Sequence, residues 1–298
     1  MSPQIQLIHQ TIGIVGLGLM GQSFVKRLDE ANIKVFGFDV QPKAIESFGQ
    51  HRFATLSELS VSCHTIIMAV FNSDQVEDAL FSDQGLLKNA KHPLNIICTS
   101  TCDPNKMHQL AEKTHQMGHQ FLELPISGTS MQLARGDCLG LVGGSLELAD
   151  QLSELLNILT PNRQYIGPVG DASKAKLSIN LVLGLHRAAL AEGLHFGVQL
   201  GLDPENLLQT FQNSAAASSV MKIKGPLMVK RSYDNPQSKV DQSLKDFGLI
   251  QDLAEEHHIV LPFAKVYTSL LSSQLNDGKG HLDNAIIFEA IQQLKIQP

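Results

Sequence analysis

Residues 12–21 read IGIVGLGLMG, and this stretch decides the fold of the first half of the chain. A β-branched run ends in a glycine-x-glycine-x-x-glycine pattern, which is typical of a strand and helix that bind a dinucleotide. The first glycine permits a tight turn, the second lets the backbone approach a pyrophosphate, and the third lets the helix pack on the sheet. The phosphates would meet the N-terminus of that helix. We therefore expect the motif to contact a dinucleotide through Gly16, Leu17, Gly18, Leu19, Met20 and Gly21.

A glycine-rich turn alone also occurs for packing reasons, so its context matters. The next β-branched run ends at Asp39, about 20 residues beyond the glycines, where an acidic side chain accepts hydrogen bonds from an adenosine ribose. No arginine directly follows Asp39, and its carboxylate would repel the additional phosphate of NADP. The order of strand, glycines, helix, strand and aspartate thus predicts a cofactor site in which NAD is favoured over NADP.

Short runs rich in Ile and Val alternate with amphipathic stretches between Thr11 and Ile166, which is typical of strand–helix units around a parallel sheet. Helices between them begin at capping signals such as Ser73-Asp74 and Asp103-Pro104. The fold class is therefore α/β, with an N-terminal Rossmann-type domain over residues 1–166. The predicted strands are Thr11–Val15, Lys34–Asp39, Thr65–Val70, Leu94–Thr99, Gln120–Leu124 and Leu139–Val142.

The second part of the chain has a different texture. Gly167, Pro168 and Gly170 lead into a long apolar segment, Ser173–Leu200, and no strand signal follows. Charged residues interrupt this segment, so we interpret it as a long interdomain helix that also packs subunits, not as a membrane span. Residues 167–298 are expected to form an all-helical substrate and oligomerisation domain. Its predicted helices open at Asp203-Pro204 and span Val240–His257, Pro262–Asn276 and Asp283–Leu294.

Composition narrows the function class. The chain has 298 residues, a formal net charge of −6 and four cysteines. A net acidic chain lacks the basic excess that binds nucleic acids or membrane surfaces. Few, irregularly spaced cysteines fit a reduced compartment, and no opposed pairs with metal-ligand spacing occur. We therefore expect a cytoplasmic protein with a small-molecule partner and without a metal, nucleic-acid or membrane partner.

Lys176 and Asn180 are the second informative pair. They are separated by four positions, so on a helix they project from one face and can address one ligand together. The alternative is that Lys176 only extends to solvent from a partly buried helix. The spacing alone does not decide between these two interpretations.

Four blocks of sequence, in order along nearly the whole chain, resemble the signatures of the β-hydroxyacid dehydrogenases. That family includes 3-hydroxyisobutyrate dehydrogenase and tartronate semialdehyde reductase. Four ordered blocks are far more specific than any one of them. The blocks are Gly16-x-Gly18-x-Met20-Gly21, Leu124-Pro125-Ile126-Ser127-Gly128, Gly167-x-x-Gly170 with Lys176 and Asn180, and Leu244-Lys245-Asp246.

The resemblance implies a role for each matching residue. Lys176 matches the catalytic lysine and Asn180 the amide that orients the substrate, while Ser127 and Gly128 match a carboxylate-binding turn. Lys245 matches a lysine that contacts both cofactor and substrate. Two further positions, Asn72 and Thr101, match places where the family's chain passes the cofactor. The implied reaction moves hydride between nicotinamide and a small hydroxy acid or semialdehyde, with Lys176 as general acid and base.

Departures from the family pattern concern the substrate. Thr129 stands where relatives commonly have a second glycine, and we expect its side chain to lie beside the substrate and to favour polar hydroxy acids. The alternative is that Thr129 only rigidifies the turn. Further departures are Phe71 for a proline, Cys98 for an aspartate, Leu133 for a small residue and Ala172 for a glycine.

Other functions remain as alternatives. The same fold also serves silent NAD(P)-binding sensors or scaffolds and imine reductases, but relatives of both kinds generally lack the lysine at position 176. A 6-phosphogluconate dehydrogenase has related motifs, but the C-terminal region here is too short for it. We expect a homodimer or homotetramer, because the predicted interdomain helix is apolar nearly all round.

Overall fold

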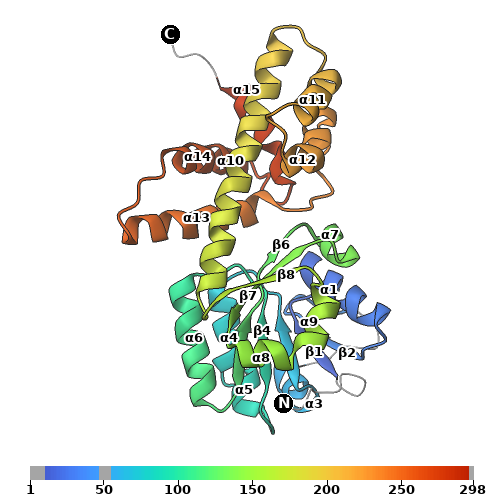
Figure 1. The fold of residues 1–298 in the computed structure, drawn as a ribbon, viewed down its shortest axis with the longest axis vertical. Helices are drawn as coiled ribbons and strands as arrows, with labels where there is room; N and C mark the ends of the chain where they lie inside the picture. The colour runs from blue at the N-terminus through green and yellow to red at the C-terminus, as the bar shows by residue number, and fades with distance from the viewer. Residues whose placement is uncertain (1–10, 47–54, 295–298) are drawn as a thin grey trace. The chain divides into compact units, whose positions relative to one another are not determined.

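A computed structural model describes residues 11–46 and 55–294 (Figure 1). Contacts divide the chain into two compact units, one ending at Lys176 and the other beginning at Leu177. Helix α10, Asp171–Gln199, runs through this division. The sequence places the division after residue 166, whereas the contacts place the first turns of α10 with the first unit, because they pack on its sheet.

The first unit is built on an eight-stranded sheet with the order β2-β1-β3-β4-β5-β7-β6, and β8 pairs with β7. Strands β1 to β5 are parallel, whereas β7 runs antiparallel to β5 and β6. The predicted α/β class is confirmed. The strands are β1 Ile12–Val15, β2 Val35–Phe38, β3 Thr65–Met68, β4 Asn95–Cys98, β5 Gln120–Glu123, β6 Ile126–Ser127, β7 Leu139–Gly144 and β8 Arg163–Gly167.

All six predicted strands are present, with ends within about two residues of those expected. Two further strands, β6 and β8, were not predicted. Strand β6 has only two residues, and β8 lies at an edge with Gln164 and Tyr165 exposed. An edge strand exposed to solvent lacks the apolar run by which the central strands are recognised.

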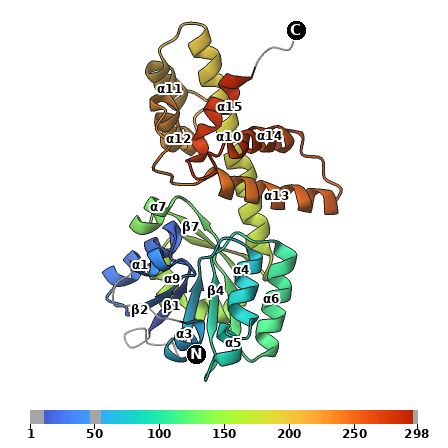
Figure 2. The same ribbon diagram turned by 180° about the vertical axis from the view of Figure 1, so that it is seen from behind.

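Alternating side chains on the strands form the cores on the two faces of the sheet. Ile12 and Ile14 of β1 belong to a cluster with residues of α1, α7, α8 and α9. Ile66 and Met68 of β3 belong to a second cluster with residues of α3, α4, α5 and α6. Helices therefore cover both faces, as Figures 1 and 2 show from opposite sides.

Two helices of the first unit begin close to the capping signals that the sequence predicts. Asp103 caps α6 as expected, whereas the cap of α4 is Asn72, one residue before the expected Ser73-Asp74. Each cap accepts hydrogen bonding from backbone amides of the first turn. The helices are α1 Leu19–Glu30, α2 Pro42–Glu46, α3 Leu56–Ser62, α4 Ser73–Phe81, α5 Leu86–Asn89, α6 Pro104–Gln116, α7 Ser130–Arg135, α8 Leu146–Gln151 and α9 Ser153–Leu159.

The second unit packs helices around the greater part of α10. Gly184 of α10 lets the rings of Phe247 and Tyr267 approach the helix, because a Cβ there would overlap Phe247. No helix among the described residues is both long and apolar enough to span a membrane. The other helices are α11 Pro204–Asn213, α12 Ser219–Lys230, α13 Val240–Glu256, α14 Pro262–Asn276, the 3-10 helix η2 Asn284–Ile286, and α15 Ile287–Gln293.

Candidate functional site

The predicted site residues of the first unit follow successive parallel strands. Gly16 follows β1, Asp39 follows β2, Asn72 follows β3, Thr101 follows β4, and Ser127 ends β6, close behind β5. Because the carboxyl ends of parallel strands meet at one edge of a sheet, these positions gather at the carboxyl edge of β1 to β5. This edge is where open α/β sheets bind their ligands.

The glycine-rich loop has the geometry of a phosphate cradle. Gly16 has a φ of +95°, and a Cβ there would overlap the carbonyl oxygen of Ala69. A Cβ on Gly21 would overlap the carbonyl oxygen of Gly16, so α1 can pack this closely only on a glycine. Among the described residues beyond its own stretch of chain, none has an atom within 4 Å of the Cβ position of Gly18. The first turn of α1 has neither a side-chain cap nor an acidic residue, so its amides suit an anion.

Asp39 joins the glycine-rich loop to the end of β2. Its Oδ2 accepts a hydrogen bond from the backbone amide of Leu17 at 2.7 Å, and its Oδ1 accepts one from Gln41 at 2.8 Å. Each carboxylate oxygen retains lone pairs for a further donor. A half-buried carboxylate is thereby fixed beside the loop, where a ribose diol would need an acceptor. The loop and Asp39 together fit a bound dinucleotide.

Asn72 and Thr101 lie on the loops that follow β3 and β4. The Asn72 side chain accepts a hydrogen bond from the amide of Gln75 at 2.9 Å and so caps α4. The amide of Phe71 donates to Oε1 of Gln75 at 2.8 Å, and the Phe71 ring is 43% exposed. Thr101 is half-buried. Both predicted cofactor contacts are thus accessible at the carboxyl edge of the sheet.

The turn after β6 contains the predicted carboxylate-binding residues. Gly128 has a φ of +154° and is exposed, and a Cβ there would lie 2.9 Å from Cβ of Cys138. Thr129 is the N-cap of α7: its hydroxyl accepts a hydrogen bond from the amide of Gln132 at 3.2 Å. The Gln132 side chain accepts one in return from the amide of Thr129 at 2.9 Å. The capping role therefore uses one lone pair of the Thr129 hydroxyl and leaves its hydrogen for another acceptor. Leu133 is fully buried in the core.

Lys176 and Asn180 lie four residues apart on α10, so they share a face of that helix. Lys176 is only 8% exposed. In the second unit, Asn180 Nδ2 donates to Asp246 Oδ2 at 2.8 Å, and Lys245 Nζ lies 2.8 Å from Asp246 Oδ1. Asp246 therefore holds both predicted site residues of that unit. The sequence placed Asp246 in a signature block but gave it no role.

Glu123 is a buried carboxylate that the sequence analysis missed. It ends β5 and is 1% exposed, and burial raises the pKa of its carboxyl. Its Oε2 accepts a hydrogen bond from the amide of Gly170 at 2.6 Å, and its Oε1 accepts one from the hydroxyl of Ser173. A glutamate that directly follows the apolar pair Phe121-Leu122 and precedes Leu124-Pro125 is the signal that was available in the sequence.

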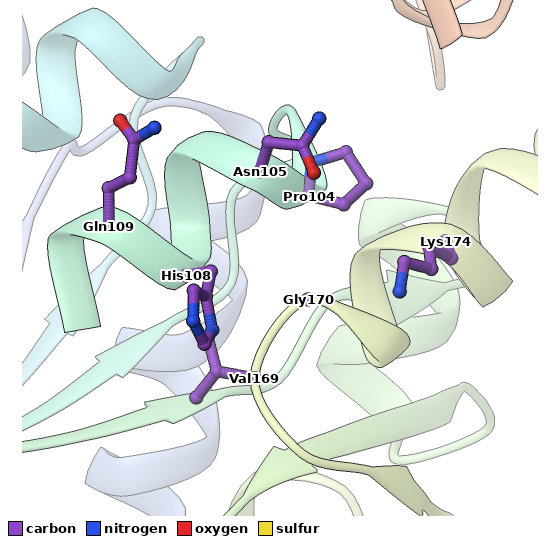
Figure 3. A pocket seen from close by; sticks show the side chains of 7 residues that line it. All are labelled: Pro104, Asn105, His108, Gln109, Val169, Gly170 and Lys174. Atoms are coloured by element: carbon purple, nitrogen blue, oxygen red, sulfur yellow. The ribbon is translucent and has the colours of Figure 1, made fainter. Parts of the chain in front are cut away.

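A surface hollow of about 390 Å³ lies where α6 meets the start of α10 (Figure 3). Its one ammonium, on Lys174, lies 2.9 Å from Asp171 Oδ1, and its His108 pairs with Glu112. None of the predicted site residues lines it. The residues that line the hollow are Pro104, Asn105, His108, Gln109, Val169, Gly170 and Lys174.

Two family models match the chain. One is described as the NAD binding domain of 6-phosphogluconate dehydrogenase and matches residues 11–167. The other is described as NAD-binding of NADP-dependent 3-hydroxyisobutyrate dehydrogenase and matches residues 170–291. Together they match both units along most of their length.

Curated relatives and a solved structure agree with these matches. The chain is 26% identical to L-threonate dehydrogenase of Cupriavidus necator, covering 97% of this chain and 98% of the relative. It is 25% identical to 2-hydroxy-3-oxopropionate reductase of Escherichia coli, covering 94% and 97%. A crystal structure of 3-hydroxyisobutyrate dehydrogenase from Salmonella typhimurium has the same fold, with a TM-score of 0.85 at 24% identity, covering 94% of this chain and 99% of that chain.

Proposed function

The chain belongs to the β-hydroxyacid dehydrogenases, the family of 6-phosphogluconate and 3-hydroxyisobutyrate dehydrogenases, and from this premise we propose that it oxidises a small hydroxy acid with NAD or reduces the corresponding semialdehyde with NADH. One observation carries the proposal: Lys176 is buried on α10 in the same compact unit as the glycine-rich loop and the turn at Ser127. Burial of a lysine is energetically costly, and a role in proton transfer beside the nicotinamide would account for its position.

The proposed chemistry assigns one task to each residue. When an alcohol is oxidised, the hydroxyl oxygen loses its proton while the carbon that bears it loses a hydride. The site therefore needs a base, and Lys176 Nζ takes this proton. Bound NAD supplies the hydride acceptor. The hydroxyl of Ser127 and the amide of Gly128 hold the substrate carboxylate. Asn180 fixes the reacting hydroxyl, and Lys245 is a further contact to substrate and cofactor. In the reducing direction the Lys176 ammonium returns the proton.

We further propose a substrate class, a small acid with more than one hydroxyl group. Thr129 supports it, because its capping hydroxyl still has a hydrogen to donate to a substrate oxygen. The curated relatives that act on L-threonate and on 2-hydroxy-3-oxopropionate are consistent with it. An apolar branched acid would leave this donor without a partner, which is costly in a closed site.

Asp39 supports NAD as the cofactor. Its carboxylate, fixed by the Leu17 and Gln41 amides, suits a ribose diol and would lie against the extra phosphate of NADP. The second family model is described by an NADP-dependent enzyme. We nevertheless propose NAD, because the residue that faces the ribose decides between the two cofactors, and in this chain that residue is the carboxylate of Asp39.

We propose that the chain forms a homodimer or homotetramer through the second unit. Several large apolar side chains of that unit are more than half exposed, and exposed apolar surface is a mark of protein–protein contact sites. They come from α10, from the α10–α11 connection, from the α13–α14 connection and from the start of α14. These residues are Val182, Phe196, Leu200, Leu202, Ile259, Val260, Phe263 and Val266.

An absorbance assay at 340 nm tests the proposed reaction. L-threonate and 3-hydroxyisobutyrate are each offered with NAD and NADP, and 2-hydroxy-3-oxopropionate with NADH and NADPH. We expect turnover with L-threonate or 2-hydroxy-3-oxopropionate and the NAD-type cofactor. Failure of all three substrates with both cofactors, in a protein that binds NADH, would support a silent cofactor-binding protein instead.

A further inference from the structure

Glu123 is unusual because its carboxylate lies in the interior of the first unit. It is 1% exposed, and ionised carboxylates are almost never fully buried unless they are paired or hydrogen-bonded. Both of its oxygens accept hydrogen bonds, one from the amide of Gly170 and one from the hydroxyl of Ser173. Both donors belong to the start of one helix, α10.

The contacts resemble a helix cap supplied from a strand. Gly170 directly precedes Asp171, the first residue of α10, and Ser173 lies in its first turn. A carboxylate at this end satisfies an amide that has no partner within the helix and interacts favourably with the helix dipole. Glu123 therefore ties the start of α10 to the end of β5.

Neighbouring residues leave room for this arrangement. Gly143 of β7 pairs with Glu123, and a Cβ on Gly143 would lie 2.8 Å from both Glu123 Oε2 and the Cβ of Ala172. The absence of a side chain at position 143 thus allows the carboxylate and the first turn of α10 to approach the sheet together. The buried Ala172, which replaces the family's glycine, lies on the same contact.

We propose that Glu123 is a positioning residue for Lys176, holding the start of α10 so that the lysine keeps its place relative to the turn at Ser127. Lys176 lies one helical turn beyond Ser173, whose hydroxyl Glu123 binds, while Ser127 follows Glu123 along the chain through Pro125. Glu123 thereby joins the strand that leads to the carboxylate turn with the helix that carries the proton-transfer group. The inference rests on the proposed function, because it concerns the geometry of that reaction.

The test begins with two variants and one control. Glu123→Gln keeps the size but loses the charge and one acceptor, and Ser173→Ala removes one of the two donors. Glu154→Gln makes the same change on the exposed face of α9 in the same unit. With the best substrate of the panel above, we expect Glu123→Gln to lower kcat by about 10- to 100-fold, because small displacements of a catalytic group have effects of this size. Ser173→Ala should act in the same direction, and Glu154→Gln should leave kcat unchanged.

Four further measurements separate positioning from general destabilisation. The Kd for NADH should stay within about threefold. The limb of the kcat–pH profile that reports the lysine in the complex should move, which is the acidic limb for oxidation and the basic limb for reduction. Glu123→Asp, which keeps the charge, should recover part of the rate. In a Lys176→Ala background, Glu123→Gln should lower the residual rate by less than about twofold, since residues that act as a unit are not additive.

The outcomes distinguish this inference from the proposed function. If Lys176→Ala retains its rate, the proposed function fails, and hydrogen exchange then tests Glu123 alone: amides of residues 171–180 should exchange faster in Glu123→Gln than in Glu154→Gln. If Lys176→Ala is inactive but folded Glu123→Gln has wild-type kcat, the positioning role is overturned. Equal losses in the presence and absence of Lys176 overturn it as well. If Glu123→Gln does not fold, Ser173→Ala decides by the same criteria.

Discussion

Asp39 and Leu17 come from successive strand–helix connections, and the Asp39 carboxylate accepts the Leu17 amide at 2.7 Å. This hydrogen bond fixes the acidic side chain beside the middle of the glycine-rich loop. It supports the proposed preference for NAD, because a carboxylate that accepts hydrogen bonds from a ribose diol repels the additional phosphate of NADP. The preference is therefore open to change at one position.

Asp39→Ser should reduce the preference for NADH over NADPH. Removal of the charge eliminates the repulsion of the 2′-phosphate and also a hydrogen-bond acceptor for the ribose. We expect the ratio of kcat/KM for NADH to that for NADPH to fall by at least about tenfold, equivalent to ~1.4 kcal/mol. Asp29→Ser, an exposed change in α1, serves as control. An unmodified enzyme that prefers NADPH would contradict the assignment of Asp39.

Thr129→Gly should lower the preference for a polyhydroxy acid over 3-hydroxyisobutyrate. The change removes the hydroxyl that we assign to a substrate oxygen and opens space, whereas Thr129→Ser should retain both the cap and the preference. Ser145→Gly removes an equivalent cap from α8 and controls for helix stability. The measurement is the ratio of kcat/KM for L-threonate and 3-hydroxyisobutyrate. A ratio unchanged within about threefold in Thr129→Gly leaves Thr129 as a cap only.

Lys224→Met should destabilise the second unit strongly. Lys224 and Asp283 are nearly inaccessible, and Lys224 Nζ lies 2.8 Å from both carboxylate oxygens. Loss of the cation leaves a buried charge without its partner, which costs about 3–5 kcal/mol. Lys222→Met, at an exposed position of the same helix, should cost less than about 0.5 kcal/mol. Denaturant unfolding monitored by circular dichroism compares the two; equal midpoints would contradict a structural role for the pair.

Glu123 should make stability depend on pH with a defined sign. Burial raises the pKa of its carboxyl above the ordinary value of 4.5, and Asp171 adds to this, whereas the Ser173 and Gly170 hydrogen bonds and Lys174 oppose it. The native state then binds the proton more tightly than the unfolded state, so the associated stability is full below pH 4.5 and is lost as pH rises through the native pKa. The free energy of unfolding of Glu123→Gln relative to wild type should therefore increase over this interval and then level off. A difference independent of pH would refute the raised pKa.

Local patterns in the sequence were enough to predict much of this fold. Gly16 and Gly21 have no room for a side chain, as the motif predicts. Helix α14 begins and ends at the predicted residues Pro262 and Asn276. Asp203 caps α11 as expected from an aspartate before a proline. Such features depend on near neighbours, which a sequence displays directly.

Features that depend on distant residues were not predicted. Nothing near Glu123 in the sequence identifies Gly170 and Ser173 as its donors, and Lys224 is separated from Asp283 by 59 positions. Strand β8 is held by pairing with β7, and its exposed residues have no apolar pattern. Helix α12 contains Pro226 in its interior, although a proline there usually kinks or ends a helix. His119 is buried, and its Nδ1 accepts a hydrogen bond at 3.1 Å from the amide of Leu94, which is 25 positions away in the sequence.

Lys176→Ala, compared with Lys174→Ala, tests the central claim most directly. The two lysines lie on the same stretch of α10, but Lys176 is 8% exposed whereas Lys174 is exposed and paired with Asp171. We predict that Lys176→Ala lowers kcat by about 10² to 10⁴-fold, the usual loss for a general acid–base group, with the Kd for NADH nearly unchanged. Lys174→Ala should retain wild-type kcat. Near-wild-type turnover by folded Lys176→Ala with any good substrate would contradict proton transfer by this lysine.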